Sequence, residues 1–273
     1  MDRYADLGGG TVSVCRLGLS TRGNTHLRAD DVRTAIDAGV NYLNWRALSD
    51  GMSEAVAELS REERERVVVA KQFFAHRESE ARAELEETLR ELDTDYIDVL
   101  TFYYTESEGE WESIVGSGGA LEALAEARER GEVRLIGVTT HQRPLAAKWL
   151  ETGLLDVVMV RYNAAHRGAE DEVFPVAEAH GVPVVAYTCQ RWGHLVRSTP
   201  DDPPSFTPPA APEWYRFVLA HPTVAVALMA PNDAIELAED LALLDDWQAP
   251  DEKQLELLRS HGQRVRKHAG NFP

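Results

Sequence analysis

The chain has 273 residues, with 46 acidic and 28 basic side chains and a formal net charge of −18. The length suits one large domain or two small ones, and 44% hydrophobic with 27% charged residues is typical of a globular protein rather than a disordered one. The strong negative charge argues against nucleic acid and anionic membranes as partners, because both attract a positive surface.

Cys15 and Cys189 lie far apart in the sequence and fit neither a disulfide framework nor a metal-binding cysteine pair. The N-terminus lacks the basic and apolar regions of a signal peptide, and no stretch reaches the roughly 18 apolar residues that span a bilayer. We therefore expect a cytoplasmic protein with reduced cysteines and no membrane partner.

Short apolar runs rich in β-branched residues recur along the chain. Gly8–Gly10 precedes the first run and predicts the tip of an N-terminal hairpin. Runs without polar alternation are typical of strands buried on both faces of a parallel sheet. The predicted strands are Val14–Leu19, Asn41–Trp45, Val67–Lys71, Ile97–Phe102, Leu135–Val138, Val157–Tyr162, Val182–Tyr187 and Val224–Met229.

The segments between these runs have helical periodicity and capping signals. The predicted helices are Val32–Ala38, Ser53–Leu59, Glu78–Leu92, Leu121–Arg130, Pro144–Glu151, Glu170–His180, Pro212–Leu219, Ala234–Leu244 and Leu255–His268. Strand–helix alternation repeated about eight times predicts a (β/α)8 TIM barrel, one domain over residues 1–273, with an N-terminal hairpin and a C-terminal helix. A doubly wound sheet is the alternative, but no GxGxxG follows the first strand.

Two loops follow predicted strand ends and are candidates for covering a substrate. Thr105–Gly119 is acidic, and Arg197–Pro212 holds most of the prolines. Both lie on the face where barrel sites form, because barrel enzymes take their chemistry from the carboxyl ends of the strands and the loops that follow.

The residues directly after the predicted strands are polar, aromatic and basic, and they include no Asp or Glu. Lys71 ends an apolar strand, so we expect its amine to point into a partly buried site where its pKa is lowered. With Arg46, Arg161, Arg167 and Arg191 it predicts a basic cup for a small anionic ligand.

Histidines follow two of these strands, at His141 and His166. Neither has partners at metal-ligand spacing, so we expect no metal ion.

Several stretches resemble the aldo-keto reductase family, in order along nearly the whole chain. They are Gly39–Leu43, Gly51–Glu54, Val67–Lys71, Leu92–Asp98, Gly131–Val138, Arg161–Asn163 and Ala186–Tyr187. The resemblance implies an NADPH-dependent carbonyl reductase on a (β/α)8 barrel. In that chemistry a tyrosine, tuned by a lysine, an aspartate and a histidine, protonates the developing alkoxide.

Carried over by residue, the resemblance keeps one of the four catalytic positions, the lysine, as Lys71. Asn44 takes the place of the aspartate, Asp50 that of the tyrosine and Tyr103 that of the histidine. The catalytic centre is therefore predicted to be degenerate. The expected substrate contacts are Trp45, Arg46, Tyr104, His141, Arg161, Arg191 and Trp192.

The resemblance also implies positions for a nicotinamide cofactor, NADP or NAD. They are Thr139, Thr140, Arg161, Tyr187 and Asn232. The segment Met229–Asp233 lacks the basic residues that usually hold a 2′-phosphate, and Asp240 replaces the asparagine that meets adenine. An acid at that place fits NADPH poorly.

Three functions remain open from the residues. The first is an NAD(P)H-dependent carbonyl oxidoreductase for a small anionic substrate, with Tyr103 or Tyr104 as the replacement acid. The second is a redox-independent lyase, isomerase or cyclase that uses Lys71 and Tyr103. The third is a binding protein on the same barrel without catalysis. Motif retention favours the first.

Overall fold

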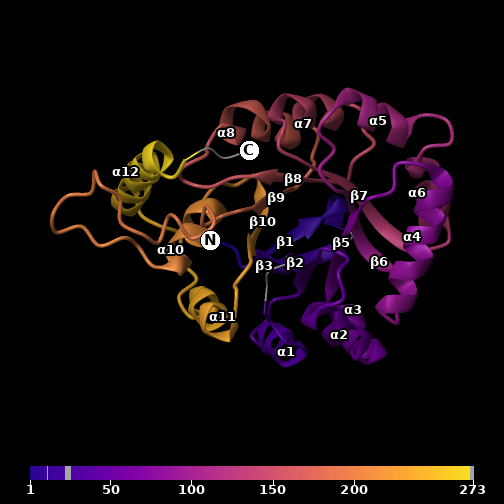
Figure 1. Cartoon of the computed structure of the whole chain (residues 1–273), viewed down its shortest axis with the longest axis horizontal. Coiled ribbons are helices and arrows are strands. Elements are labelled where there is room, and N and C mark those ends of the chain that lie inside the picture. Colours follow the sequence, from indigo (N-terminus) through magenta and orange to yellow (C-terminus); the bar gives the residue numbers. More distant parts are fainter. Residues whose placement is uncertain (11, 22–25, 271–273) are drawn as a thin grey trace.

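The computed structural model describes residues 1–10, 12–21 and 26–270. Eight parallel strands close a barrel in the order β10-β3-β4-β5-β6-β7-β8-β9. Figure 1 shows the helices arranged around these strands. The strands are β3 (Leu17–Ser20), β4 (Tyr42–Trp45), β5 (Val68–Phe73), β6 (Ile97–Phe102), β7 (Val133–Thr140), β8 (Val157–Arg161), β9 (Val184–Tyr187) and β10 (Val224–Met229). The predicted (β/α)8 barrel is confirmed.

The helices lie in the connections between the strands, as predicted. They are α1 (Ala29–Asp37), α2 (Gly51–Ala57), α3 (Arg61–Arg66), α4 (Glu78–Glu91), α5 (Glu108–Val115), α6 (Ala120–Glu129), α7 (Arg143–Leu150), α8 (Ala169–Glu172), α9 (Phe174–Ala179), α10 (Ala211–Leu219), α11 (Ala234–Leu241) and α12 (Glu252–His268). No helix in the described part of the chain is both long and apolar enough to cross a membrane.

The N-terminal hairpin is formed by β1 (Tyr4–Leu7) and β2 (Val12–Cys15), which pair antiparallel across the turn Gly8–Gly10. Leu7, Val12 and Val14 pack in one apolar cluster with barrel residues near the beginnings of the strands, such as Val68 and Leu135. The hairpin therefore closes the amino-terminal end of the barrel. The opposite end, where the strands finish, is called the barrel mouth below.

Three boundaries differ from the predictions. The predicted strand Val14–Leu19 contains parts of two strands, because the chain leaves the hairpin at Cys15 and enters the barrel at Leu17. The predicted helix Glu170–His180 is divided into α8 and α9 next to Pro175, which has no backbone N–H to donate. The predicted loop Thr105–Gly119 contains α5, capped by the Ser107 side chain.

Apolar side chains form one cluster inside the barrel and another between the barrel and the helices. Successive side chains of a strand point alternately to one cluster and to the other. Val68 and Ala70 lie in the cluster inside the barrel, whereas Val69 and Phe73 lie in the cluster between barrel and helices. Every second residue of a strand therefore faces the barrel axis, which decides which strand-end side chains reach the mouth.

A buried ion pair joins three neighbouring strands near their beginnings. Asp98 of β6 is fully buried, and its carboxylate accepts hydrogen bonds from Arg64 Nη1 at 2.9 Å and from the Val69 amide at 2.9 Å. Its other oxygen accepts from Arg134 Nη1 at 2.8 Å. Both arginines also contact the Tyr96 ring, with guanidinium carbons 4.1 and 4.3 Å from its centroid. This charge network is far from the mouth and is structural.

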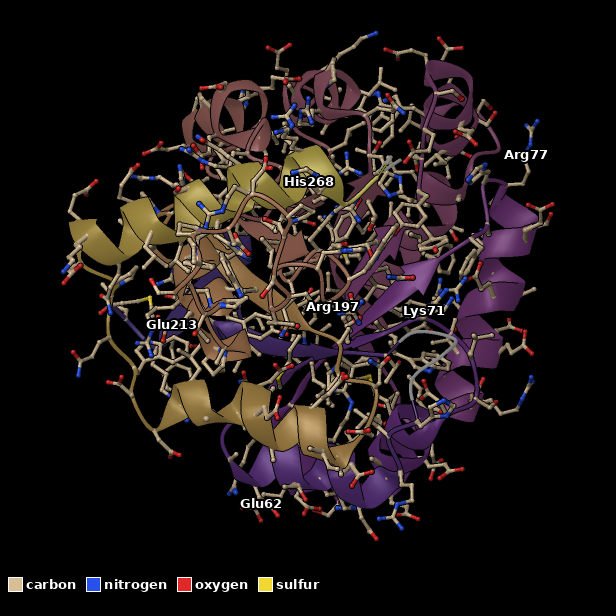
Figure 2. All side chains as sticks on the ribbon, turned by 60° about the vertical axis from the view of Figure 1, so that its left-hand side comes forward. Glu62, Lys71, Arg77, Arg197, Glu213 and His268 are labelled. Carbon is tan, nitrogen blue, oxygen red and sulfur yellow. The ribbon has the colours of Figure 1, made fainter. Side chains whose placement is uncertain are left out.

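The C-terminal helix α12 is fixed by a close backbone approach and by ion pairs. A Cβ at Gly262 would lie 2.3 Å from the Ala164 carbonyl oxygen, so only glycine allows this packing distance. Arg264 Nε binds the Asp202 carboxylate at 2.6 Å, which ties the proline-rich segment to the helix. Figure 2 labels Arg197 in that segment and His268 at the end of α12.

Candidate functional site

Lys71 does not point into the barrel mouth. It lies on the outward face of β5 with Val69 and Phe73, and its amine is paired with Glu84 of α4. Burial lowers the pKa of Lys71, while Glu84 acts in the opposite direction. The expected direction of the pKa is confirmed, but the expectation that the amine enters the site is wrong. The lyase, isomerase or cyclase reaction that would use the Lys71 amine therefore lacks that amine at the mouth.

The next residue of β5, Gln72, has the inward direction instead. It shares the barrel face with Ala70, and its side chain is buried. The resemblance aligns the family's catalytic lysine with Lys71, so the residue of β5 that faces the mouth is a glutamine and not that lysine. Strand alternation from Val68 and Ala70 is the signal that could have identified Gln72 from the sequence.

Several buried polar atoms near the mouth have no hydrogen-bond partner within the described residues, and three of them belong to neutral side chains on barrel strands. They are Asn44 Oδ1, Gln72 Oε1 and Thr139 Oγ1. Asn44 and Thr139 are fully buried, and among the described residues the Asn44 amide donates to Ser20 Oγ at 3.1 Å. Because buried polar atoms are nearly always paired, these atoms indicate a place for a polar ligand or for water.

An aromatic row crosses the mouth from the end of β5 to the end of β7. The ring of Tyr103 lies 4.8 Å from Phe74 and 4.1 Å from Tyr104, and Tyr104 stacks on His141 at 4.2 Å. The guanidinium carbon of Arg46 lies 5.8 Å from the centroid of Tyr103. The structure thus brings together four of the predicted site residues.

Tyr187 completes this group from β9, inside the barrel. Its ring centroid is 6.1 Å from Tyr104 and 5.9 Å from His141. Its hydroxyl donates to the Thr140 carbonyl at 3.3 Å, and burial raises its pKa well above the ordinary value. Burial likewise raises the pKa of Tyr104 to about 12. Both hydroxyls are therefore protonated at neutral pH.

Glu106 was missed by the sequence analysis, which expected no acid at the mouth. Its Oε1 accepts from the His141 amide at 2.8 Å and lies 3.1 Å from His141 Nδ1, and its Oε2 accepts from Gln142 Nε2 at 3.1 Å. The expectation of an acid-free cup is wrong, because the loop after β6 folds back over the end of β7. The chain reverses at a turn that includes Tyr104, whose φ is 44°. No local sequence pattern indicates this turn.

The predicted basic cup is smaller than expected. Arg167 forms two hydrogen bonds with the Glu170 carboxylate, at 2.8 and 2.6 Å, and so belongs to an ion pair beside α8. Arg191 is buried and donates to His166 Nε2 and to the carbonyls of Ala269 and Gly270. That arginine fastens the end of α12 to the segment after β9.

Arg46 and Arg161 are the predicted cations that stay at the mouth. Arg161 ends β8, and burial lowers its pKa while the neighbouring Tyr187, Tyr104 and Glu106 act to raise it.

Two further predicted site residues have local structural contacts. Trp45 lies on the outward face of β4, buried among apolar residues, and its indole N–H donates to the Leu48 carbonyl at 2.8 Å. The expectation that it contacts a substrate inside the barrel is therefore wrong. Asp50 is the N-cap of α2, where one oxygen accepts from the amides of Met52 and Ser53.

A cavity of about 680 Å³ lies beside the mouth, between the ends of β9 and β10, the proline-rich segment and α11. Leu228, which belongs to the cluster inside the barrel, is one of its lining residues, so the cavity reaches the barrel interior. Trp192 and Asn232, both predicted site residues, line it as well.

The polar wall of this cavity is acidic. Glu236, Glu239 and Asp240 line it, and Arg197 is also among the lining residues. Asp240 is buried, accepts from Tyr215 Oη and Gln190 Nε2 at 2.9 Å each, and burial raises its pKa to about 7. A carboxyl group perturbed in this way inside a cavity is typical of a binding site.

The amides at the start of α11 are already bonded to acids of the same segment. Asp233 Oδ1 accepts from the amides of Ile235 and Glu236 at 2.9 and 3.0 Å. Glu236 in turn accepts from the Asn232 amide at 2.7 Å and from its side-chain nitrogen. An incoming phosphate would have to displace carboxylates here, which is unfavourable.

Backbone strain concentrates around the same region. Ala47, Tyr104, Thr188, Arg191 and Trp192 have φ between 44° and 64°, and all lie in connections that follow barrel strands at the mouth. Such conformations are costly for residues other than glycine and cluster at functional sites. The mouth and the adjoining cavity are therefore the candidate functional site.

Solved structures of similar fold cover nearly the whole chain. The aldo-keto reductase AKR11C1 from Bacillus halodurans, in its holo form, superposes with a TM-score of 0.76 at 19% identity, over 97% of this chain and 96% of that one. The thermostable aldo-keto reductase Tm1743, in complex with the inhibitor epalrestat, has a TM-score of 0.73 at 23% identity, over 94% and 99% of the two chains. These similarities show the shared fold.

Curated relatives match in sequence over part of their length. The chain is 27% identical over 118 residues to the NADH-specific methylglyoxal reductase of Escherichia coli (strain K12), which is 42% of this chain and 34% of that protein. It is 25% identical over 171 residues to methylglyoxal reductase DkgB of Salmonella typhimurium, or 61% of this chain and 62% of that protein. The chain thus spans less than two thirds of these relatives.

The sequence profile of the Aldo/keto reductase family matches residues 7–250, which include every strand of the barrel and the cavity beside its mouth. This match agrees with the architecture and with the resemblance inferred from the motifs. The chain belongs to the aldo/keto reductase family.

Proposed function

We propose that the protein is an oxidoreductase that reduces a small carbonyl compound with a nicotinamide dinucleotide, and that it prefers NADH to NADPH. The observation that carries this proposal is the set of unpaired buried polar atoms at the mouth, Asn44 Oδ1, Gln72 Oε1 and Thr139 Oγ1. A planar carboxamide offers both donors and an acceptor to such a set. Tyr187 supplies an aromatic face nearby. These residues fit a nicotinamide group.

When bound, the reduced nicotinamide supplies hydride to a carbonyl carbon. The chain itself binds and orients the two reactants and excludes water. Arg46 and Arg161 are the side chains we propose for an anionic group on the substrate, and the row from Phe74 to Tyr104 gives its carbon skeleton an apolar wall.

The preference for NADH is supported by the acidic cavity. Glu236, Glu239 and Asp240 repel a 2′-phosphate, whereas a carboxylate accepts a hydrogen bond from a ribose 2′-hydroxyl. One relative that matches part of the chain is named as an NADH-specific methylglyoxal reductase.

Calorimetric titration with each dinucleotide tests this function. We expect NADH to bind at least about tenfold more tightly than NADPH, because like charges in close contact cost several kcal/mol. Glu236→Gln should reduce the difference, and Glu252→Gln, an exposed change of the same charge on α12, should leave it unaltered. Absence of binding by both dinucleotides at millimolar concentration would instead leave the barrel as a binding protein for another ligand.

Adjacent residues of β5 provide a second test, because they face opposite sides of the strand. Lys71→Met should leave NADH affinity and carbonyl reduction of the folded enzyme within about twofold, because the amine lies outside the barrel mouth. The change leaves Glu84 without its partner and should therefore lower stability. Gln72→Met should weaken NADH binding, since it removes a polar group from the mouth. Titration and steady-state rates of both variants decide the matter, and a loss of turnover in Lys71→Met alone would contradict this arrangement.

A further inference from the structure

We propose that His141 is the residue that gives a proton to the substrate oxygen in carbonyl reduction and takes it back in the reverse direction, with Glu106 as its positioning residue. This inference rests on the proposed function and names the acid that the reaction needs. It replaces the expectation that Tyr103 takes that role.

The position of His141 supports this role. Its ring lies over the mouth, stacked on Tyr104 at 4.2 Å and edge-on to Tyr187 at 5.9 Å. Tyr187 belongs to the cluster inside the barrel, and Tyr104 packs against that cluster. A carbonyl compound held in this space would lie against the imidazole.

Glu106 holds the imidazole in one orientation. Its Oε1 lies 3.1 Å from His141 Nδ1 and accepts from the His141 amide at 2.8 Å and from Thr140 Oγ1 at 3.4 Å. Its Oε2 accepts from Gln142 Nε2 at 3.1 Å. A carboxylate fixed by donors of three successive residues keeps Nδ1 protonated, so Nε2 is the nitrogen left for the substrate.

The other acids at the mouth are less suitable. The hydroxyl of Tyr187 is bonded to the Thr140 carbonyl, and burial raises the pKa of Tyr104 to about 12. Lys71, the residue expected to activate a tyrosine, is paired with Glu84 outside the barrel. Tyr104, whose backbone has φ of 44°, stacks its ring on His141 with the ring centroids 4.2 Å apart.

The proton balance of the reaction is complete with this residue. The carbonyl carbon gains hydride from the dihydronicotinamide, the π electrons of the C–O bond move to oxygen, and that oxygen takes the proton from Nε2 of the imidazolium. The neutral ring then takes a proton from solvent. In alcohol oxidation, neutral Nε2 removes the hydroxyl proton as hydride leaves the same carbon for the oxidised nicotinamide.

The charges around His141 predict opposite pH profiles for the two directions. Burial lowers its pKa below 6.5, Arg161 of β8 acts in the same direction, and Glu106 acts to raise it, while the neighbouring Tyr104 and Tyr187 are neutral. Reduction needs the imidazolium, so its kcat/KM should fall as the pH rises through this pKa. Oxidation needs the neutral ring and should rise over the same interval.

The test measures both directions across pH for the whole chain, with NADH or NAD⁺ and a panel of small aldehydes, ketones and 2-oxo acids. His141→Gln should lower kcat at least about 100-fold and abolish the shared pH limb, with NADH affinity unchanged. Glu106→Gln should move the descending limb of reduction to lower pH, because it removes an anion from the imidazole. His180→Gln, at the exposed end of α9, is the matched control and should change neither.

The outcomes separate the two proposals. If the His141→Gln variant turns over as fast as the wild type, or keeps the pH limb, the role of His141 is overturned and the proposed reductase function is unaffected. A wild-type chain that binds NADH but turns over no carbonyl compound and no alcohol in the panel overturns the proposed function, and this inference with it. Circular dichroism and thermal melts of each variant show that lost activity is not lost folding.

Discussion

Asp240→Asn is expected to stabilise the protein at pH 8 by about 4 kcal/mol relative to the wild type. The pKa of the buried Asp240 is raised from an ordinary 3.8 to about 7, first by burial and further by Glu236 and Glu239. The unfolded chain loses this proton near pH 4 and the folded chain keeps it until about pH 7. Stability due to this group therefore falls as the pH rises between these values, and the full cost is present above pH 7.

Asparagine avoids this cost because it stays neutral and has nearly the same shape. Its oxygen can accept from Tyr215 Oη or Gln190 Nε2, the two donors that bind the carboxylate at 2.9 Å. Urea unfolding at pH 5 and pH 8 measures the effect, and the advantage of the variant should grow by about 3 kcal/mol between them. Asp245→Asn, the same change at an exposed site, should give a pH-independent difference. An equal advantage of Asp240→Asn at both pH values would contradict the raised pKa.

A carboxyl group that lowers stability and lines a cavity is better explained by binding than by folding. The same group is one of the three acids that disfavour a 2′-phosphate in the proposed function. The variant therefore has a second expected effect, a smaller preference for NADH, and stability and selectivity should change in opposite directions. That trade is typical of binding sites.

The barrel could be predicted from the sequence because its strands are mostly apolar runs, and segments with helical periodicity separate them. Periodicity is a local property, so neither long-range contacts nor known relatives are needed to detect it. The N-terminal hairpin could be predicted from a local signal as well, the three glycines Gly8–Gly10 that form its turn. The first strand was predicted wrongly because Val14–Leu19 is an apolar run interrupted only by Arg16. In the structure Arg16 lies between β2 of the hairpin and β3 of the barrel.

The candidate site could be predicted only to the level of the strand ends. Lys71 and Gln72 are neighbours at one strand end, and a one-residue difference in direction decides which of them reaches the mouth. Trp45 was placed inside the barrel for the same reason. Glu106 is a different case, since its place beside His141 depends on a loop that reverses at Tyr104 and returns to another strand. Contacts of that kind depend on tertiary structure and have no periodic signal.

Asp98→Ala is expected to destabilise the chain by about 3–5 kcal/mol, because it removes one partner of a buried ion pair and leaves the other charged. Arg64, whose side chain is 7% exposed, would lose the carboxylate that it pairs with. Its remaining bonds go to Thr94 Oγ1 and to the Val67 and Tyr96 carbonyls. The Val69 amide would lose its acceptor in addition. The expected fall in melting temperature is about 10 °C.

Two control variants separate burial of the charge from loss of a contact. Arg134→Leu removes the half-exposed partner of Asp98 and should cost about 1 kcal/mol, because Arg64 and the Val69 amide still bind the carboxylate. Glu62→Ala breaks an exposed ion pair with Arg66 and should change stability by less than that. Calorimetric melts of the three variants test the order. If Asp98→Ala cost no more than Arg134→Leu, burial of the charge would not be the source of the effect. The role of Asp98 in joining β5, β6 and β7 would then be contradicted.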